Sequence, residues 1–333
     1  MSVSVGRTRN YGEPLFMELI RAIDLFCGAG GSSWGAQCAG VEIAAGFDMW
    51  SVAEAVFKAN FPEAKFYGGR LEEHDPDSIA KELGKIDLIM ASPECTNHSV
   101  AKGNKPRCEK SRETAMQVVR FAEALRPRWL VIENVVNMKS WARYEEFIET
   151  IEGLGYKTHT QALNAADFGV PQARRRLFIL GDLKQKPSAV KIPRRKRRSA
   201  SDIIDGNGTY HYSPLRTERR AAGTLARAER AIAEVGNKSA FLIVYYGTDQ
   251  AGGWQRLDAP LRTITTLDRF AFVKRDGKRH IMRMLQPPEL KAAMGWQTKY
   301  KINHGTRRDK IKMIGNAVCP PVMKDIVKTL IKK

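Results

Sequence analysis

Apolar runs alternate with helix-like stretches throughout the first half of this chain. The apolar runs read as buried strands, and they lie at residues 20–26, 41–47, 86–91, 129–132 and 177–180. Helical periodicity fills stretches between them, at residues 51–60, 114–125 and 144–154. This alternation predicts an α/β fold with a doubly wound, mostly parallel sheet and helices on both faces. Ligands of such sheets bind at the carboxyl ends of the strands.

The pattern changes after Asp182. A dense cationic run, KIPRRKRR, occupies residues 191–198, and more arginines and turn-forming residues follow it. We assign residues 184–279 to a second, smaller and basic domain. Within it, residues 241–246 and 261–266 are predicted strands.

The two ends of the chain complete the predicted domain organisation. Residues 280–333 return to a helical style, at 288–294 and again at 311–330, so we expect them to pack back on the first domain. Residues 1–17 lack an apolar core and read as a flexible tail rather than a secretory signal. The first domain is therefore expected to span residues 18–183.

The net charge of the chain indicates what kind of partner it binds. It carries 55 Lys and Arg against 36 Asp and Glu, a formal net charge of +19. Such an excess favours a polyanion, and nucleic acid above all. No window approaches the roughly 18 apolar residues that a membrane helix needs, so we expect no membrane partner. A cytoplasmic monomer is the resulting expectation.

The cysteines do not form a framework. They number five, an odd count, and none of their spacings is typical of a zinc or redox motif, so we expect neither a disulfide scaffold nor a metal site. Cys27, Cys38 and Cys319 have apolar or glycine-rich neighbours and are predicted to be small core residues. Cys95 differs, because a polar and basic loop follows it.

A glycine-rich turn follows the first predicted strand. Gly28, Gly30 and Gly31 let the backbone turn sharply and approach a ligand. Asp48 ends the next strand, at the spacing expected of a group that binds ribose hydroxyls. Ser33 stands where a dinucleotide fingerprint has glycine, which disfavours an NAD-dependent oxidoreductase and favours a nucleoside cofactor without a pyrophosphate.

A thiol, a carboxylate and two guanidinium groups each lie beside a predicted strand. Cys95 and Glu133 come just after strands, and Arg174 and Arg176 precede one. Each has a plain alternative: a core thiol, a helix cap and surface charges. Together they could activate a pyrimidine, since a thiol adds to the ring, an acid protonates it and cations hold its carbonyl.

These motifs resemble those of one family, the cytosine-C5 DNA methyltransferases, from about residue 19 to 322. The segments that carry the resemblance occur in the family's order and are Phe26-x-Gly28-x-Gly30, Asp48, Pro93-Glu94-Cys95, Ser99, Glu133-Asn134-Val135, Gln172-x-Arg174-x-Arg176 and Gly315-Asn316-x-Val318. The resemblance implies a Rossmann-like class I methyltransferase domain and a target-recognition domain.

The resemblance also implies a mechanism. The Cys95 thiolate would add to C6 of a cytosine flipped out of the duplex, Glu133 would protonate N3, and Arg176, supported by Arg174, would hold the O2 carbonyl. S-adenosylmethionine would donate a methyl group to C5 and leave as S-adenosylhomocysteine.

Further site residues follow from the same resemblance. Cofactor contacts are implied at Phe26, Gly28, Ala29, Gly30, Gly31, Asp48, Met49, Pro93, Asn316 and Ala317. Double-stranded DNA is the expected partner, with contacts at Ser99, Lys102, Gln172, Arg194, Arg195, Arg197 and Arg198.

Two other functions stay open at this point. One branch of the family methylates tRNA cytosine by the same chemistry, although the long variable segment at 184–279 favours a domain that reads DNA bases. A catalytically inactive DNA-binding regulator is the other, and it would not need Cys95, Glu133 and both arginines together.

Overall fold

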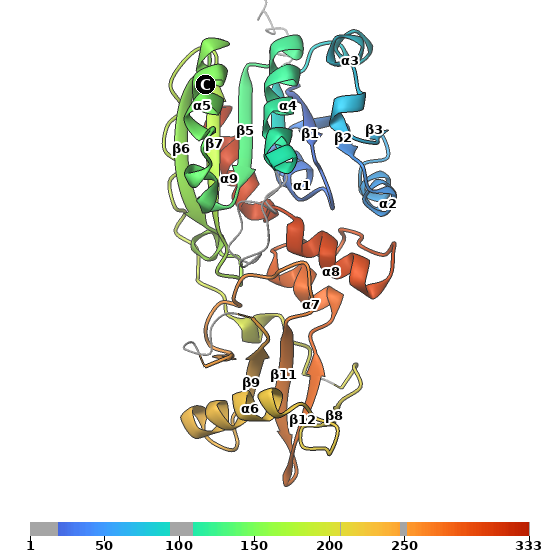
Figure 1. Cartoon of the computed structure of the whole chain (residues 1–333), viewed down its shortest axis with the longest axis vertical. Helices are drawn as coiled ribbons and strands as arrows, with labels where there is room; N and C mark the ends of the chain where they lie inside the picture. Colours follow the sequence, from blue (N-terminus) through green and yellow to red (C-terminus); the bar gives the residue numbers. More distant parts are fainter. Residues whose placement is uncertain (1–18, 94–108, 207, 247–251, 333) are drawn as a thin grey trace, which may run out of the picture.

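The larger lobe is built on one seven-stranded sheet, seen in the upper half of Figure 1. The computed structural model describes residues 19–93, 109–206, 208–246 and 252–332. The strand order is β3-β2-β1-β4-β5-β7-β6. Their bounds are β1 (Arg21–Leu25), β2 (Glu42–Asp48), β3 (Lys65–Gly68), β4 (Leu88–Ala91), β5 (Trp129–Asn134), β6 (Lys157–Asn164) and β7 (Arg175–Asp182).

Most of this sheet is parallel, which confirms the predicted fold class. The exception is β7, which pairs antiparallel with both β5 and β6. Strands β3 and β6 were not predicted; β6 is mostly half-buried and polar, so it lacks the apolar run that marks β1, β4 and β5.

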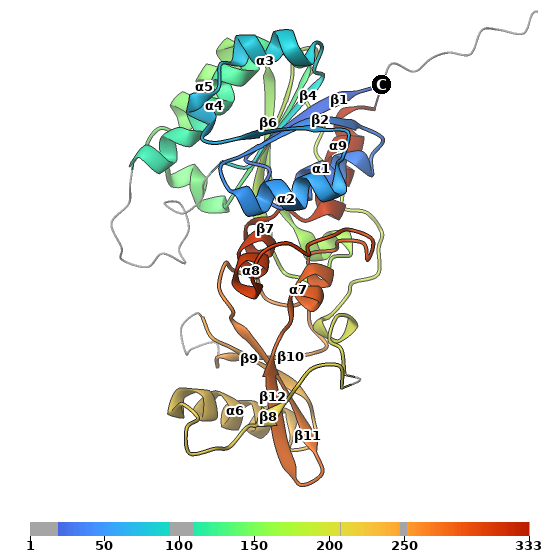
Figure 2. The same cartoon turned by 90° about the vertical axis from the view of Figure 1, so that its right-hand side faces the viewer.

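Helices cover both faces of the sheet (Figure 2). One layer contains α3 (Pro76–Leu83), α4 (Glu109–Leu125) and α5 (Tyr144–Gly153), and the other contains α1 (Gly31–Gln37), α2 (Ser51–Asn60) and α9 (Pro320–Leu330). Alternate residues of β4 enter the two cores, since Leu88 and Met90 pack with the α1 layer, and Ile89 packs with the α4 layer. This two-sided burial is why the central strands are continuous apolar runs.

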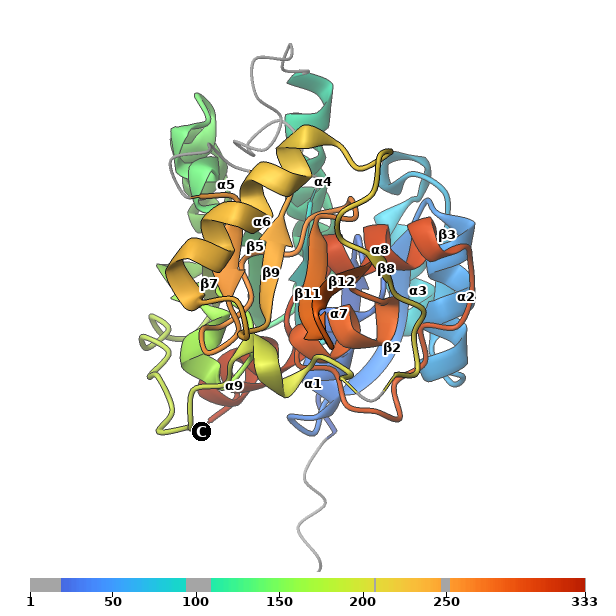
Figure 3. The same cartoon turned by 90° about the horizontal axis from the view of Figure 1, so that it is seen from below.

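The smaller lobe has its own antiparallel sheet, in the order β10-β9-β11-β12-β8. The strands are β8 (Ser213–Pro214), β9 (Phe241–Val244), β10 (Trp254–Arg256), β11 (Phe270–Asp276) and β12 (Arg279–Met284). Helix α6 (Ala222–Val235) crosses one face of this sheet, as Figure 3 shows from below. The sheet ends at Met284 rather than at the expected boundary of 279, because β12 forms a hairpin with β11.

The opposite face of the small sheet joins the core of the large lobe. Leu242 and Phe272 belong to the same hydrophobic cluster as Leu290 of α7 (Pro287–Ala293) and Ile314 of α8 (Arg307–Asn316). The predicted helical stretch 311–330 is thus two helices, α8 and α9. The pair Pro320-Pro321 at the start of α9 explains the break.

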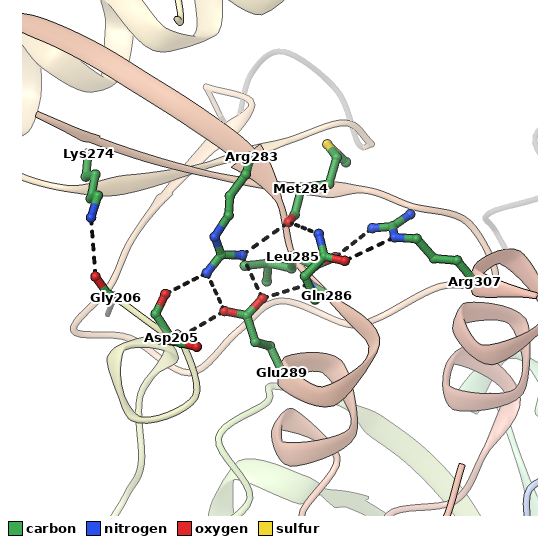
Figure 4. Close-up of polar contacts among 9 residues, drawn as sticks. All are labelled: Asp205, Gly206, Lys274, Arg283, Met284, Leu285, Gln286, Glu289 and Arg307. Carbon is green, nitrogen blue, oxygen red and sulfur yellow. Dashed lines mark hydrogen bonds and ion pairs between the residues drawn. The ribbon is translucent and has the colours of Figure 1, made fainter. Parts of the chain in front are cut away.

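A buried ion pair fixes the junction between the lobes (Figure 4). Arg283 of β12 contacts Glu289 of α7 at 2.6 Å, and both side chains are at most 3% exposed. The Arg283 guanidinium also donates to the Asp205 carbonyl oxygen at 2.8 Å. Removing either charged partner would leave the other buried and uncompensated, so the pair specifies one junction geometry.

The predicted strand at 261–266 is wrong. The described part of this segment forms only an isolated bridge between Leu261 and Gln172. Its backbone is bound by side chains instead, because the Ile264 amide donates to Gln172 Oε1 at 2.9 Å and the Ile264 carbonyl accepts from Arg174 at 3.0 Å. Within the described ranges, no helix has the length and apolar content needed to cross a bilayer.

Candidate active site

The turn after β1 has an unusual backbone. Phe26, Gly28 and Gly30 have positive φ angles of 61°, 49° and 70°. The Gly30 amide donates to the Cys27 carbonyl at 2.7 Å, which closes the turn just before α1 begins. Glycine suits two of these left-handed positions because it has no Cβ.

The glycines of this turn serve different purposes. At Gly28 the nearest atom to an added Cβ would be Asp48 Oδ2, 4.0 Å away, so this position is open. A Cβ at Gly31 would collide with the Val318 carbonyl, and one at Gly30 would meet the Tyr300 hydroxyl. Gly30 and Gly31 are therefore required by packing, and Ala29 is fully buried. Gly28 is the glycine of this turn that faces open space.

Asp48 lies at the end of β2, opposite this turn. Its Oδ2 accepts from the Gly28 amide and its Oδ1 from the Trp50 amide, both at 2.9 Å. These bonds orient the carboxylate at the sheet edge, and its contact with ribose hydroxyls stays a prediction.

A pocket with an empty volume of about 410 Å³ opens at the same place. Its lining is Phe26, Phe47, Asp48, Met49, Gly69, Arg70, Leu71, Glu72 and Thr114. Aromatic and aliphatic walls with the carboxylates of Asp48 and Glu72 suit a nucleoside such as an adenosyl group. Met49 is 62% exposed and would be covered by such a ligand.

A buried carboxylate supports the turn from beneath. Asp24 Oδ2 accepts from both the Ser33 hydroxyl at 2.6 Å and the Ser33 amide at 3.1 Å. Burial raises the pKa of Asp24 to about 7. Burial also raises the pKa of Cys27 well above its usual range, which agrees with the prediction that Cys27 is a core residue.

The C-terminal segment reaches the same turn. Asn316 is exposed at the end of α8 and Ala317 is buried next to it. The close approach of Val318 to Gly31 places this pair beside the start of α1. Two segments nearly 300 residues apart thus meet at the turn before α1.

The strands β4 and β5 place Pro93 beside the end of β5. They are parallel neighbours, with Ala91 in register with Ile132. Asn134 Nδ2 donates to the carbonyl of buried Pro93 at 3.3 Å, so the chain leaving β4 is tied to the end of β5. Cys95, Ser99 and Lys102 lie outside the described residues.

Glu133 and Arg176 form a buried ion pair across β5 and β7. Arg176 Nε lies 3.1 Å from Glu133 Oε1, and the side chains are 16% and 8% exposed. Burial raises the pKa of Glu133, while Arg176 and then Arg174 oppose the shift. A buried carboxyl with a raised pKa beside a guanidinium is typical of proton-transfer sites.

Arg174, which was expected to support Arg176, is bound to backbone carbonyls of two distant segments. Its guanidinium donates to the Ile264 carbonyl at 3.0 Å and to the Gly315 carbonyl at 2.8 Å, and it is 3% exposed. Its hydrogen bonds thus hold the small-lobe segment and the C-terminal motif together. These contacts suit a positioning role, and its support of Arg176 in catalysis stays a prediction.

Gln172 is also corrected. It is fully buried, and its amide binds the Met294 sulfur, the Ala293 carbonyl and the Ile264 amide. It presents no surface to DNA in this structure. Its role is to fasten the segment before β7 to α7 and to the small lobe.

A small pocket is lined by both arginines and by Cys319. Burial raises the pKa of Cys319 to about 11, although both arginines oppose the shift. This thiol is therefore protonated at neutral pH, and the prediction that it is a core residue is confirmed. Thiols in this state are poor nucleophiles.

The basic run at 191–198 lies along the large lobe, at the right-hand side of Figure 2. Arg195 pairs with Asp325 of α9 at 2.8 Å and donates to the Phe168 carbonyl at 3.0 Å. Arg197 pairs with Asp167 at 2.8 Å. Arg198 lies 3.7 Å from Asp202, and Arg194 is exposed. Three of the four arginines predicted to bind DNA thus have carboxylate partners at the surface, and their contact with DNA stays a prediction.

A basic groove on the small lobe was missed by the sequence analysis. It has an empty volume of about 1240 Å³ and is lined by Arg230, Ala233, Glu234, Gly252, Trp254, Gln255, Arg256, Ala259, Pro260 and Arg262. Its cations come from three separate segments, so no local run of charge reveals them. The bridge between Leu261 and Gln172 places one end of the groove beside the segment that leads to Arg176.

Solved structures with similar folds are methyltransferases. A mutant of DNMT2 from Spodoptera frugiperda superposes with a TM-score of 0.69 at 16% identity, over 94% of this chain and all of that one. The Entamoeba histolytica methyltransferase EhMeth gives 0.68 at 16% identity, over 94% and 98%. The fold is that of a class I methyltransferase.

The family can also be stated. The family model "C-5 cytosine-specific DNA methylase" matches residues 20–332, and this chain belongs to that family. Type II methyltransferase M.FnuDI of Fusobacterium nucleatum is 25% identical over 90% of both chains. M.AgeI of Thalassovita gelatinovora is 34% identical over 49% of this chain, which spans only 39% of that relative.

Proposed function

We propose that this chain transfers the methyl group of S-adenosylmethionine to C5 of cytosine in duplex DNA. The observation that carries the proposal is the pair of Glu133 and Arg176, at the sheet edge that also holds the pocket beside Asp48. A carboxyl group with a raised pKa and a guanidinium side by side match N3 and O2 of one cytosine ring.

The pocket residues fit the cofactor. Phe26, Gly28, Asp48 and Met49 would hold the adenosyl part, and Asn316 and Ala317 lie beside the same turn. When bound, S-adenosylmethionine supplies a methyl group on an electrophilic sulfonium.

The residues of the chain would activate the base. The Cys95 thiolate forms a bond to C6, and the electron pair of the C5–C6 double bond moves into the ring while Glu133 gives a proton to N3. Arg176 stabilises charge on the O2 carbonyl. As C5 takes the methyl group, N3 returns its proton to Glu133. A base from solvent then takes the C5 proton, its electron pair restores the C5–C6 double bond, and the bond to sulfur breaks to release the Cys95 thiolate.

The base must leave the duplex for this chemistry, because a stacked ring offers no face to a thiol. Unstacking costs a few kcal/mol. Phosphate contacts of a protein with a net charge of +19 can offset that cost through counterion release.

The proposal predicts a defined product. Duplex DNA incubated with the protein and isotopically labelled S-adenosylmethionine should yield labelled 5-methylcytosine on digestion and mass spectrometry. Parallel reactions with tRNA test the alternative substrate. Label in adenine, or in tRNA alone, would contradict the proposal.

We infer that the groove on the small lobe contacts the DNA near the target base. Arg230 and Arg256 are exposed there, Trp254 offers an aromatic face, and one end of the groove adjoins the segment leading to Arg176. Guanidinium groups suit both phosphates and guanine edges. Ion pairs occur on both surfaces, since Arg256 contacts Asp258 at 3.1 Å, and Arg195 and Arg197 contact Asp325 and Asp167. The position of the groove beside the segment that leads to Arg176 favours it over the run at 191–198.

This inference makes a salt-dependence prediction. The double variant Arg230→Ala/Arg256→Ala should bind duplex DNA more weakly. The fall of its log affinity with log salt should be shallower by about 2, one for each lost phosphate contact. The matched control is Arg194→Ala/Arg197→Ala, which removes the same charge and should leave the slope nearly unchanged. Fluorescence anisotropy across a salt series measures both, and the reverse ranking would reassign DNA binding to the basic run.

A further inference from the structure

An aromatic cluster lies beneath the glycine turn. Tyr300, from the chain between α7 and α8, is 1% exposed. Its ring centroid is 5.0 Å from that of Trp34, 5.6 Å from that of Trp296 and 6.2 Å from that of Phe61. Three rings from separate segments therefore fix the orientation of the Tyr300 ring.

The hydroxyl of Tyr300 contacts the turn directly. It donates a hydrogen bond to the carbonyl of Ala29, a residue that is fully buried. Ala29 stands between Gly28 and Gly30, both of which have left-handed backbones. The hydroxyl also occupies the space that a side chain at position 30 would need. The Tyr300 hydroxyl thus binds the residue between Gly28 and Gly30 and also packs against Gly30.

The backbone around Tyr300 is anchored independently of the turn. Lys291 Nζ of α7 donates to the Tyr300 carbonyl at 2.7 Å. Asn60 at the end of α2 exchanges two hydrogen bonds with the backbone of Lys301, each 2.8 Å long. Because both anchors lie outside the turn, the hydroxyl is held in place whether or not a ligand is bound.

We propose that Tyr300 is a positioning residue for cofactor binding, and that its hydroxyl holds the Ala29 carbonyl so that Gly28 and Phe26 face the adenosyl pocket. This inference rests on the proposed use of S-adenosylmethionine. The C-terminal segment would thereby contribute to cofactor affinity from behind the turn, without touching the ligand. Burial raises the pKa of Tyr300 well above its usual range, so the hydroxyl is a proton donor at all ordinary pH values.

The chain offers a matched control for the test. Tyr156 is also buried, at 2% exposed, and its hydroxyl donates to the Pro127 carbonyl at 2.6 Å. Pro127 lies just before β5, at the opposite edge of the sheet from the glycine turn. Tyr300→Phe and Tyr156→Phe therefore each delete one buried hydrogen bond from a tyrosine to a backbone carbonyl, and only the first bond belongs to the turn.

The test compares cofactor affinity in the two variants by calorimetry with S-adenosylhomocysteine and S-adenosylmethionine. Tyr300→Phe should weaken both ligands about 3- to 10-fold, the equivalent of one buried hydrogen bond. Its KM for S-adenosylmethionine should rise while kcat and the KM for DNA stay near wild type. Tyr156→Phe should lower the melting temperature to a similar extent and leave cofactor affinity unchanged.

Two outcomes would overturn the proposal: wild-type cofactor affinity in Tyr300→Phe, or an equal loss in both variants, which would indicate a general loss of stability. Hydrogen exchange of the Gly30 amide in the ligand-free protein gives a second readout and should be faster only in Tyr300→Phe. Unchanged exchange there would also count against the proposal. Failure of the wild-type protein to bind S-adenosylmethionine would instead refute the proposed function itself.

Discussion

Replacing Cys95 with alanine is expected to abolish methyl transfer, with a loss in kcat of about 10⁴-fold or more. Without the thiolate no bond forms at C6, and C5 of cytosine is too weak a nucleophile to accept the methyl group. Binding of DNA and cofactor should persist, because neither depends on that bond. The measurement is single-turnover methylation of duplex DNA.

Cys38→Ala is the matched control for this prediction. Cys38 is half-buried just after α1, and its removal should leave the rate nearly unchanged. Duplex DNA containing 5-fluorocytosine gives a second measurement, since fluorine blocks the final elimination and should trap the wild-type protein covalently. Trapping of the Cys95→Ala protein, or none of the wild type, would contradict the assigned nucleophile.

The sequence predicts the cofactor half of the site better than the rest. Asp48 and Gly28 each follow a parallel strand, and the carboxyl ends of parallel strands share one edge. Their meeting therefore follows from strand direction alone. The structure places them within one hydrogen bond, from the Gly28 amide to Asp48.

The guanidinium half depends on the reversal of one strand. Arg176 lies at the start of β7, and in a parallel strand that start would be at the opposite edge from Glu133. Because β7 runs antiparallel to β5, the two residues meet. An apolar run has the same composition whichever way the strand points. Strand periodicity therefore cannot show that β7 runs antiparallel to β5.

The contacts of Gln172 and Arg174 could not be predicted from the sequence, because their partners are distant in the chain. Both lie in a motif whose residue types suit DNA and substrate binding, yet both hold segments that are about 90 to 140 residues away in the sequence. A polar side chain that satisfies a distant backbone has the same sequence signature as one that binds a ligand. Burial is the property that separates the two cases.

Glu133→Gln is expected to lower kcat by about 10²- to 10⁴-fold, the usual range for loss of a general acid. The glutamine amide keeps the shape of the side chain and can still accept from Arg176, but it has no proton to give to N3. The KM for S-adenosylmethionine should change little, because the adenosyl pocket is lined by other residues. On the alkaline side of its pH profile the wild-type rate should decline as Glu133 ionises, and the residual rate of the variant should lack that decline.

The same substitution should reveal the raised pKa through stability. Because burial raises the pKa of folded Glu133 above its unfolded value, its stabilising contribution is present below the unfolded pKa and is lost as pH rises through the folded pKa. A glutamine at position 133 stays neutral at every pH, so its contribution to stability does not fall as pH rises. The free energy of unfolding of Glu133→Gln, relative to wild type, should therefore increase with pH between 4.5 and 8.5 in urea titrations.

An exposed glutamate provides the control of opposite sign. Arg143 lies 2.6 Å from Glu146 in α5 and lowers the pKa of that carboxyl. Its contribution is present above the unfolded pKa and is lost as pH falls, so the relative stability of Glu146→Gln should decrease as pH rises, while methylation is unaffected. If Glu133→Gln followed the same trend as Glu146→Gln, attraction to Arg176 would outweigh burial, and Glu133 would be ionised at neutral pH and unable to serve as the acid.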